Sequence, residues 1–271
     1  MTEAEWVVMT KEADLNSGRN VDSPYAEPQL ISSADECYFY HTMDVPGHGT
    51  IEGEWDLRGS VDKYLGHFDF TGKRVLDVGA ASGILSFHIE KQGAEVVSFD
   101  LSENFDWDIV PFAENDSDAT RNGRRAHLRK INNGYWLCHK AFGSKARMVN
   151  GVVYDIPQTI GPVDVAVFGS ILLHLRDPFL ALENAARLAQ ETIIVSDLSP
   201  YGRMASKFKK NPRFMPKSAD PNGINDGWFR LPPLLVQEYL GILGFKRSTV
   251  MWNNFKYGKR VRPIYTVIAH R

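Results

Sequence analysis

The chain has 271 residues, of which 43% are hydrophobic and 24% charged, and its formal net charge is −2. This is the composition of a globular protein with a sizeable core, and it excludes intrinsic disorder. The near-neutral charge excludes a global field that attracts nucleic acid or a membrane, and the two cysteines are too few for a disulfide framework or a multi-cysteine metal site. We expect a cytoplasmic protein without a membrane partner, because the N-terminus lacks a signal-peptide pattern and no apolar run reaches ~18 residues.

Two segments precede the first clear strand. Residues 1–36 are polar and show no sustained helical or strand period, which predicts a loose N-terminal arm. Residues 37–70 include YFYHTMDVPGHGTIEGEWDLRG, which is rich in aromatic and turn residues but also lacks a clear period. We predict that residues 37–70 pack over the ligand site as a lid.

From Lys73 onward, strand and helix patterns alternate. RVLDVG, EVVSFD, ARMVNGVVYD, PVDVAVFGSILLH and ETIIVSDLS read as strands, whereas ILSFHIEKQG and DPFLALENAARLAQ have helical spacing. Such alternation predicts a parallel sheet. Residues 200–233 are a polar insert rich in proline and glycine, after which PLLVQEYLGILG reads as a helix and FKRSTVMW and PIYTVIAH as two final strands.

The first of these strands ends in a turn of small residues, Asp77-Val-Gly79-Ala-Ala81-Ser-Gly83. Such a turn lets backbone N–H groups and a helix N-terminus approach a ligand closely. A dinucleotide fingerprint has glycine at its sixth position, where this chain has Ile84. The acid before the first glycine suits a ligand with an ammonium group, so the turn favours an amino-acid nucleoside.

A second acid completes the pattern. Asp100 ends the next apolar run, 21 positions after Gly79, where a carboxylate can accept hydrogen bonds from both hydroxyls of a ribose. The alternative is that Asp77 and Asp100 are turn residues of another doubly wound protein. A nicotinamide-dependent reductase is disfavoured by the missing sixth-position glycine.

The order and spacing of these elements over residues 71–271 resemble class I S-adenosylmethionine-dependent methyltransferases. The resemblance implies an α/β fold with a Rossmann-like, seven-stranded, mostly parallel sheet that ends in an antiparallel hairpin, and S-adenosylmethionine as the cofactor. It implies Gly79, Ala80 and Gly83 against the methionine moiety, Asp100 on the ribose, and Tyr154 and Asp155 beside the adenine. The predicted cofactor-binding residues are Trp55, Arg58, Asp77, Gly79, Ala80, Gly83, Asp100, Leu101, Tyr154, Asp155, Gly169 and Ser170.

A narrower resemblance rests on HTMDVPGHGTIEGEWDLRG and GSILLHLRDPFLALE, which are similar to segments of the group that contains tRNA wobble-uridine carboxymethyltransferases and their relatives. In those enzymes a tyrosine holds the extra carboxylate of a carboxylated cofactor. The matching position here is Leu173. This departure favours ordinary S-adenosylmethionine, and the resemblance does not carry tRNA over as the substrate.

The methyl acceptor is expected at the carboxyl ends of the strands, near His174, Asp197 and the loop that begins at Tyr201. His174 is the candidate general base, because imidazole titrates near neutral pH; the alternative is a structural role bonded to the backbone. Tyr201 and Trp228, from the 200–233 insert, are candidates for the acceptor pocket, with loop anchoring as the alternative.

Trp55 and Arg58 are expected to close over the cofactor. An aromatic face attracts a sulfonium charge, and a guanidinium binds a carboxylate through two hydrogen bonds. The alternative for both residues is a role in packing the connecting segment.

Two basic segments, residues 121–147 and 203–217, contain no acid, and the second is interleaved with Phe208 and Phe214. Basic and aromatic residues together can bind RNA, which is therefore the second candidate acceptor. The near-neutral total charge favours a small-molecule acceptor instead. A third possibility is a cofactor-binding module without catalysis, against which the complete cofactor pattern counts.

Overall fold

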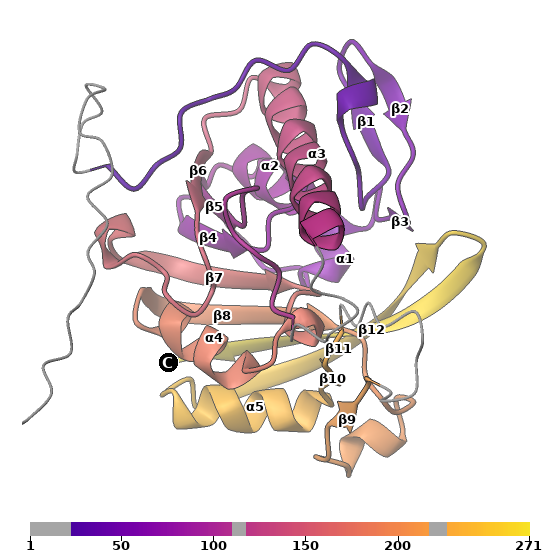
Figure 1. The fold of residues 1–271 in the computed structure, drawn as a ribbon. Coiled ribbons are helices and arrows are strands. Elements are labelled where there is room, and N and C mark those ends of the chain that lie inside the picture. The colour runs from indigo at the N-terminus through magenta and orange to yellow at the C-terminus, as the bar shows by residue number, and fades with distance from the viewer. Residues whose placement is uncertain (1–22, 110–117, 217–226) are drawn as a thin grey trace, which may run out of the picture.

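The computed structural model describes residues 23–109, 118–216 and 227–271, so most of the predicted N-terminal arm lies outside the described residues. The described chain builds one large sheet with strand order β3-β11-β12-β8-β7-β4-β5-β6 (Figure 1). Its strands are β3 (Trp55–Asp56), β4 (Arg74–Val78), β5 (Glu95–Asp100), β6 (Arg147–Asn150), β7 (Val163–Gly169), β8 (Ala189–Asp197), β11 (Arg247–Tyr257) and β12 (Arg260–His270).

The sheet confirms the predicted Rossmann-like architecture. Strands β6, β5, β4, β7 and β8 run parallel, and β12 and β11 close the sheet as an antiparallel hairpin. Beyond the seven predicted strands, the lid contributes β3, which pairs with β11 through Trp55 opposite Tyr257. Two residues are too few to produce a strand period in the sequence, so this edge strand was not expected.

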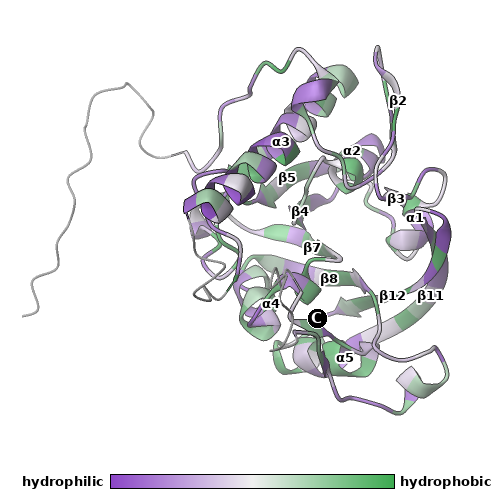
Figure 2. Cartoon of the chain, turned by 45° about the vertical axis from the view of Figure 1, so that its right-hand side comes forward, coloured by the Kyte–Doolittle hydropathy of each residue, from purple (hydrophilic) through white to green (hydrophobic). Residues whose placement is uncertain are grey.

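Helices cover both faces of the sheet. Helices α2 (Ile84–Lys91) and α3 (Asp118–Phe142) lie on one face, and α4 (Pro178–Ala186) and α5 (Pro233–Ile242) lie on the other (Figure 1). Figure 2 shows hydrophobic residues along the central strands, which separate the two apolar cores. None of the helices in the described residues is long and apolar enough to span a membrane.

The sequence pattern did not indicate α3. Its centre contains Asn132, Asn133 and Gly134, which are poor helix formers. Here they serve packing: Asn133 donates to the Glu36 carbonyl at 2.9 Å. A Cβ on Gly134 would lie 3.0 Å from the Tyr38 carbonyl oxygen. These residues allow α3 to contact the lid closely.

The last residues of the predicted arm form the short 3-10 helix η1 (Ala34–Glu36). The lid contains a hairpin of β1 (Met43–Val45) and β2 (Gly49–Ile51), and α1 (Val61–Tyr64). The insert folds into η4 (Ala205–Lys207) and a hairpin of β9 (Arg213–Phe214) and β10 (Phe229–Arg230). Two further 3-10 helices, η2 (Gln158–Ile160) and η3 (Leu172–His174), follow β6 and β7. Lid and insert both lie at the carboxyl ends of the parallel strands.

Candidate active site

The cofactor turn, residues 77–83, connects β4 to α2 through three residues with positive φ. The φ angles are +80° at Gly79, +48° at Ala81 and +87° at Gly83. A Cβ on Gly79 would lie 2.8 Å from Ile171 Cδ1, so the loop after β7 packs directly on the glycine. The small residues let the turn fold tightly at the carboxyl edge of the sheet, where ligands bind in open α/β folds.

Asp100, the last residue of β5, is bonded to this turn. Its Oδ2 accepts a 2.6 Å hydrogen bond from the Ala81 N–H, and its Oδ1 accepts a 2.7 Å bond from the Leu101 N–H. Burial raises the pKa of Asp100 to about 6, and the two N–H donors oppose this rise. A carboxylate has about four acceptor positions, so Asp100 keeps capacity for the two hydroxyls of a ribose.

Asp77 lies beneath the turn rather than on its surface. It is buried, and its Oδ2 accepts a 2.6 Å bond from Ser86, which also contacts Ser98 at 2.8 Å. Its Oδ1 has no hydrogen-bond partner among the described residues. Burial raises the pKa of Asp77 to about 7. The arrangement supports the cofactor turn from below through a buried polar network.

A cavity of about 810 Å³ opens at the carboxyl ends of the parallel strands. This volume falls within the range of roughly 300–1,000 Å³ that is typical of ligand sites. Gly79 and Asp100 line it from the first two strands, and Gly169 and Ser170 from the end of β7. Ser170 has a φ of +55°, unusual for a residue with a side chain and common at functional sites.

The lid closes one side of the cavity and is bonded to the β11–β12 hairpin. The Tyr38 hydroxyl donates to Glu54 Oε1, and the Tyr257 hydroxyl donates to Glu54 Oε2 at 3.0 Å. The Trp55 ring lies 4.7 Å from the Tyr257 ring, centroid to centroid. Glu54 therefore joins two parts of the lid to the hairpin, and the rings give this side an aromatic surface.

Two imidazoles also face the cavity from the lid and α3. His41 is half-buried, and its buried Nδ1 has no hydrogen-bond partner among the described residues. Burial lowers the pKa of His41 to about 4, so the ring is neutral at pH 7. His127, from α3, packs on Tyr38 with ring centroids 4.4 Å apart, and burial lowers its pKa as well. Both rings can accept hydrogen bonds at neutral pH.

On another side of the cavity, Asp108 joins several loops. Its carboxylate accepts hydrogen bonds from the Tyr154 hydroxyl and from the Arg176 side chain, and a 2.7 Å bond from the Arg176 N–H. Its carbonyl accepts a 2.6 Å bond from the Trp228 indole N–H. The loops after β5, β6 and β7 and the insert are therefore held together around one residue.

The structure brings many of the sequence-predicted residues to this cavity. Leu173, whose identity favours the ordinary cofactor, also lines it. The individual roles of the predicted residues at the cavity remain predictions. The lining includes Trp55, Gly79, Asp100, Leu101, Tyr154, Gly169, Ser170 and His174.

Arg58 does not line the cavity. Its guanidinium forms two 2.9 Å hydrogen bonds with Asp56 and one of 2.8 Å with Asp44. These bonds raise its pKa further and occupy the donors that were expected to bind a cofactor carboxylate. In this structure, Arg58 stabilises the lid.

Four other predicted cofactor residues also lie away from the cavity lining, one of them Asp77, which is buried beneath the turn. Ala80 is buried, and Gly83 packs beside Phe87, so both are required by the fold of the turn. Asp155 is exposed on the loop after β6. The cavity wall near that loop is formed instead by Val152 and Val153, whose apolar side chains suit an adenine ring.

The expected acceptor-pocket aromatics have the contacts of loop anchors. Trp228 is buried, and its backbone N–H donates to the Leu173 carbonyl at 2.7 Å. The Tyr201 hydroxyl donates to the Asn211 carbonyl at 3.0 Å, and Lys209 lies over its ring. Neither residue lines the cavity, so their direct contact with an acceptor is still only a prediction.

Several polar residues that sequence reasoning did not single out do face the cavity, among them His41, Glu54, Arg230 and Arg262. Their positions depend on how the lid, the insert and the terminal hairpin pack together, which sequence periodicity does not encode. The available signal was local: an acid beside Trp55, and an arginine two residues after Trp228 in the insert.

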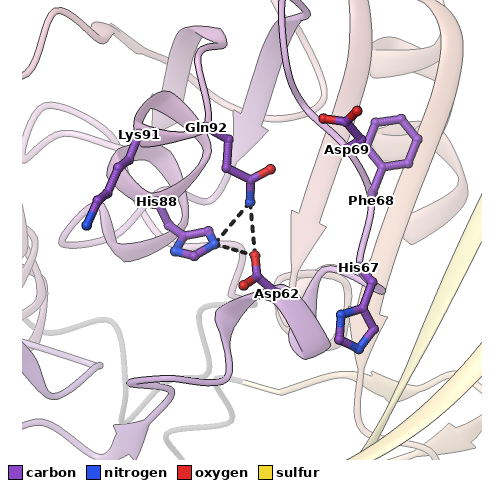
Figure 3. A pocket seen from close by; sticks show the side chains of 7 residues that line it. All are labelled: Asp62, His67, Phe68, Asp69, His88, Lys91 and Gln92. Atoms are coloured by element: carbon purple, nitrogen blue, oxygen red, sulfur yellow. Dashed lines mark hydrogen bonds and ion pairs between the residues drawn. The ribbon is translucent and has the colours of Figure 1, made fainter.

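A second hollow lies between the end of α2 and the chain that leads into β4 (Figure 3). Asp62 Oδ1 lies 2.7 Å from His88 Nε2 and accepts a 3.0 Å bond from Gln92. These side chains form hydrogen bonds with one another, and the hollow is not lined by any residue of the cofactor turn or of the strand ends beside it. The described residues contain no group of three or more His, Cys, Asp or Glu side chains placed to hold a metal ion.

Comparison with known proteins agrees with this geometry. Residues 56–223 match a family model described as a methyltransferase domain. The N-terminal domain of EvdMO1, solved in the presence of SAH and D-fucose, is 17% identical, with a TM-score of 0.52 and coverage of 84% of this chain and 89% of that one. A putative methyltransferase from Bacillus halodurans is 13% identical, with a TM-score of 0.52 and coverage of 78% and 99%. No curated protein matches the sequence significantly.

The fold and the site together define an S-adenosylmethionine-dependent methyltransferase. The chain belongs to the methyltransferase-domain family, because the family model covers more than half of it. The residues present fit the cofactor: Gly79 brings the backbone of the turn to the cavity wall, and Asp100 keeps free acceptor positions at the cavity. The predicted class of enzyme and its cofactor are thereby confirmed.

Proposed function

We propose that this enzyme transfers a methyl group to a small-molecule acceptor that binds inside the cavity between the lid and the strand ends. The observation that carries the proposal is the lid along one side of the cavity, where Glu54 is bonded to both Tyr38 and Tyr257. A cavity of this size with an aromatic wall suits a compact acceptor.

S-adenosylmethionine supplies an electrophilic methyl group, and the protein's task is alignment. Asp100 would hold the ribose, the turn at Gly79 would lie against the amino-acid part, and Val152 and Val153 would contact the adenine. The Trp55 ring would face the sulfonium side of the cavity. Rigid support of these groups by the sheet keeps acceptor, methyl carbon and sulfur in line, and such positioning can contribute much of the rate.

An acceptor hydroxyl or ammonium must lose a proton as the new bond to carbon forms. His174 is the base predicted from sequence, and it lines the cavity after β7. His41 is a second candidate because its buried Nδ1 has no partner among the described residues and the ring is neutral. If either histidine takes the proton, its alanine variant loses turnover while SAH affinity changes less than two-fold; unchanged turnover removes that histidine from the mechanism.

The class of acceptor is tested by methyl transfer from radiolabelled S-adenosylmethionine into a cell extract separated into small molecules, RNA and protein. We expect label in the small-molecule fraction with the wild type and its loss with Asp100→Asn. Label that is confined to RNA would refute a small-molecule acceptor.

RNA remains the second candidate because the segment 203–217 combines basic and aromatic residues. Within its described part, Phe208 is 81% exposed and Phe214 57% exposed among lysines and arginines. The other basic segment, 121–147, is largely neutralised: Arg129 and Arg147 pair with Glu103 and Glu95.

The RNA alternative predicts that wild-type protein shifts tRNA in a gel at low salt, and that Phe208→Ala combined with Phe214→Ala abolishes the shift. No shift at 50 mM salt would remove RNA as a candidate, because phosphate contacts strengthen as salt falls.

A further inference from the structure

The acidic and basic side chains that line the cavity differ in how many bonding partners they have within the protein. Its four acids are all engaged: Glu54 by two tyrosine hydroxyls, Asp100 by two backbone N–H groups, Asp106 by Arg125 at 3.4 Å, and Asp108 by Arg176. Among the described residues, two guanidiniums that line the cavity, Arg230 and Arg262, form no ion pair. Glu54 and Asp100 accept hydrogen bonds only from neutral groups and so keep their charge, but their acceptor positions are partly occupied. Arg230 and Arg262 are therefore the cations at the cavity that are available to a ligand carboxylate.

The two guanidiniums come from different structural elements. Arg262 lies on β12 within the β11–β12 hairpin, whereas Arg230 lies on β10 of the insert. S-adenosylmethionine carries one carboxylate, so the cofactor can neutralise only one of them. The other guanidinium would face the methyl acceptor. This step rests on the proposed function, in which a small-molecule acceptor binds in the same cavity.

Arg230 is the guanidinium on the acceptor side. The backbone N–H of Trp228, two residues before it, donates to the Leu173 carbonyl at 2.7 Å, which fixes the insert hairpin over η3. The hairpin itself is closed by Phe229 opposite Phe214. Arg230 thus lines the cavity in company with His174 and Leu198, at the carboxyl ends of β7 and β8.

One hydrogen-bond donor of the Arg230 side chain is buried without an acceptor. Its Nε is buried and has no hydrogen-bond partner among the described residues. Asp197 forms no ion pair with it within 4.0 Å; burial raises the pKa of Asp197 to about 7, and the Arg230 charge only partly opposes this rise. A buried donor without a partner is costly, and a planar carboxylate would satisfy Nε and a terminal nitrogen together.

We propose that Arg230 binds a carboxylate of the methyl acceptor, and that this enzyme methylates small organic acids. A carboxylate, with one negative charge, matches a single guanidinium better than a phosphate dianion does. The aromatic lid on the other side of the cavity favours acids with an apolar or aromatic body.

The experiment compares matched acids and primary amides as ligands of the SAH-bound protein by calorimetry: benzoate with benzamide, 4-hydroxybenzoate with 4-hydroxybenzamide, and hexanoate with hexanamide. The variants are Arg230→Gln and Arg230→Lys. Arg213→Gln is the matched control, because Arg213 lies opposite Arg230 in the same hairpin but is exposed and outside the cavity.

We expect at least one acid to bind the wild type about 10- to 100-fold more tightly than its amide, which is the range for hydrogen bonds to a charged group. Arg230→Gln should abolish this preference, Arg230→Lys should retain part of it, and Arg213→Gln should leave it unchanged. SAH affinity should change less than two-fold in all three variants.

Equal affinities for acids and amides in the wild type, no binding of any acid, or a preference that survives Arg230→Gln would overturn the assignment. A preference lost with Arg262→Gln instead of Arg230→Gln would overturn it too. A failure of the proposed function itself is recognised separately, because the wild type would then bind SAH but transfer label from S-adenosylmethionine only to RNA or protein.

Discussion

The Asp100 carboxylate accepts a 2.6 Å hydrogen bond from the Ala81 N–H, which joins the end of β5 to the middle of the cofactor turn. One residue thereby shapes the turn and presents acceptor positions to the cavity. Because burial raises the pKa of Asp100 to about 6, the charge of this carboxyl changes within an accessible pH range. If Asp100 binds the ribose as we predict, cofactor binding will depend on pH.

We predict that SAH binds about ten-fold more weakly at pH 5 than at pH 7. With a pKa near 6, Asp100 is mostly protonated at pH 5, and a protonated carboxyl loses acceptor capacity. Calorimetric titrations between pH 5 and 8 measure the effect. In Asp100→Asn, the affinity should be lower throughout and nearly independent of pH; a wild-type affinity that is flat over this range would contradict the assignment.

Ala81→Gly should stabilise the protein or leave its stability unchanged, although it removes a methyl group. Ala81 has a φ of +48°, which costs a residue with a Cβ about 1 kcal/mol relative to glycine. The gain is offset in part by the greater freedom of glycine in the unfolded chain. Urea unfolding measures the change, and a loss of more than about 1 kcal/mol would show that the Ala81 methyl packs in a way that relieves this strain.

Replacing Trp55 by alanine should weaken SAM binding more than it lowers the melting temperature. Trp55 is only partly buried, and its ring packs in a tilted orientation against Tyr257 at the cavity, so the fold loses little while the cofactor loses an aromatic face. SAM and SAH affinities should both be measured, because the sulfonium charge is present only in SAM. Unchanged SAM affinity would remove Trp55 from the cofactor site.

Stability should increase as pH falls from 8 to 5.5. Burial raises the pKa of Asp77 to about 7, so the stability that its neutral form contributes is present at low pH and is lost as pH rises through 7. Asp197 should contribute to the same pH dependence of stability, since burial also raises its pKa to about 7.

The change in melting temperature between pH 8 and 5.5 should shrink in Asp77→Asn, because asparagine does not ionise. Comparable pH dependence in the variant and the wild type would mean that Asp77 is not a main source of the effect. Lys63→Gln, a change at an exposed residue of α1, is a suitable control that should not alter the pH dependence.

The parallel strands and the cofactor turn were predictable because their signals are local. Val75 to Gly83 combines an apolar strand with a turn that only small residues permit, and Asp100 lies at a fixed spacing from it. Helix α3 was missed because Asn132, Asn133 and Gly134 at its centre are chosen for contacts with the lid and the strands rather than for helix propensity.

The cavity wall was less predictable because it depends on contacts between distant segments. Arg58 was expected at the cofactor, but Asp44 and Asp56 bind its guanidinium. Trp228 was expected at the acceptor, but its indole donates to the Asp108 carbonyl and places Arg230 in the cavity instead. Sequence spacing indicates which residues are near a strand end, whereas tertiary packing decides which of them face the ligand.

The central claim is tested most directly by calorimetric titration of the wild-type protein with SAH and, separately, with NADH. We predict saturable binding of one SAH per chain, loss of at least ten-fold in affinity with Asp100→Asn, and no heat of binding with NADH. Binding of NADH without binding of SAH would contradict the assignment of this site to S-adenosylmethionine.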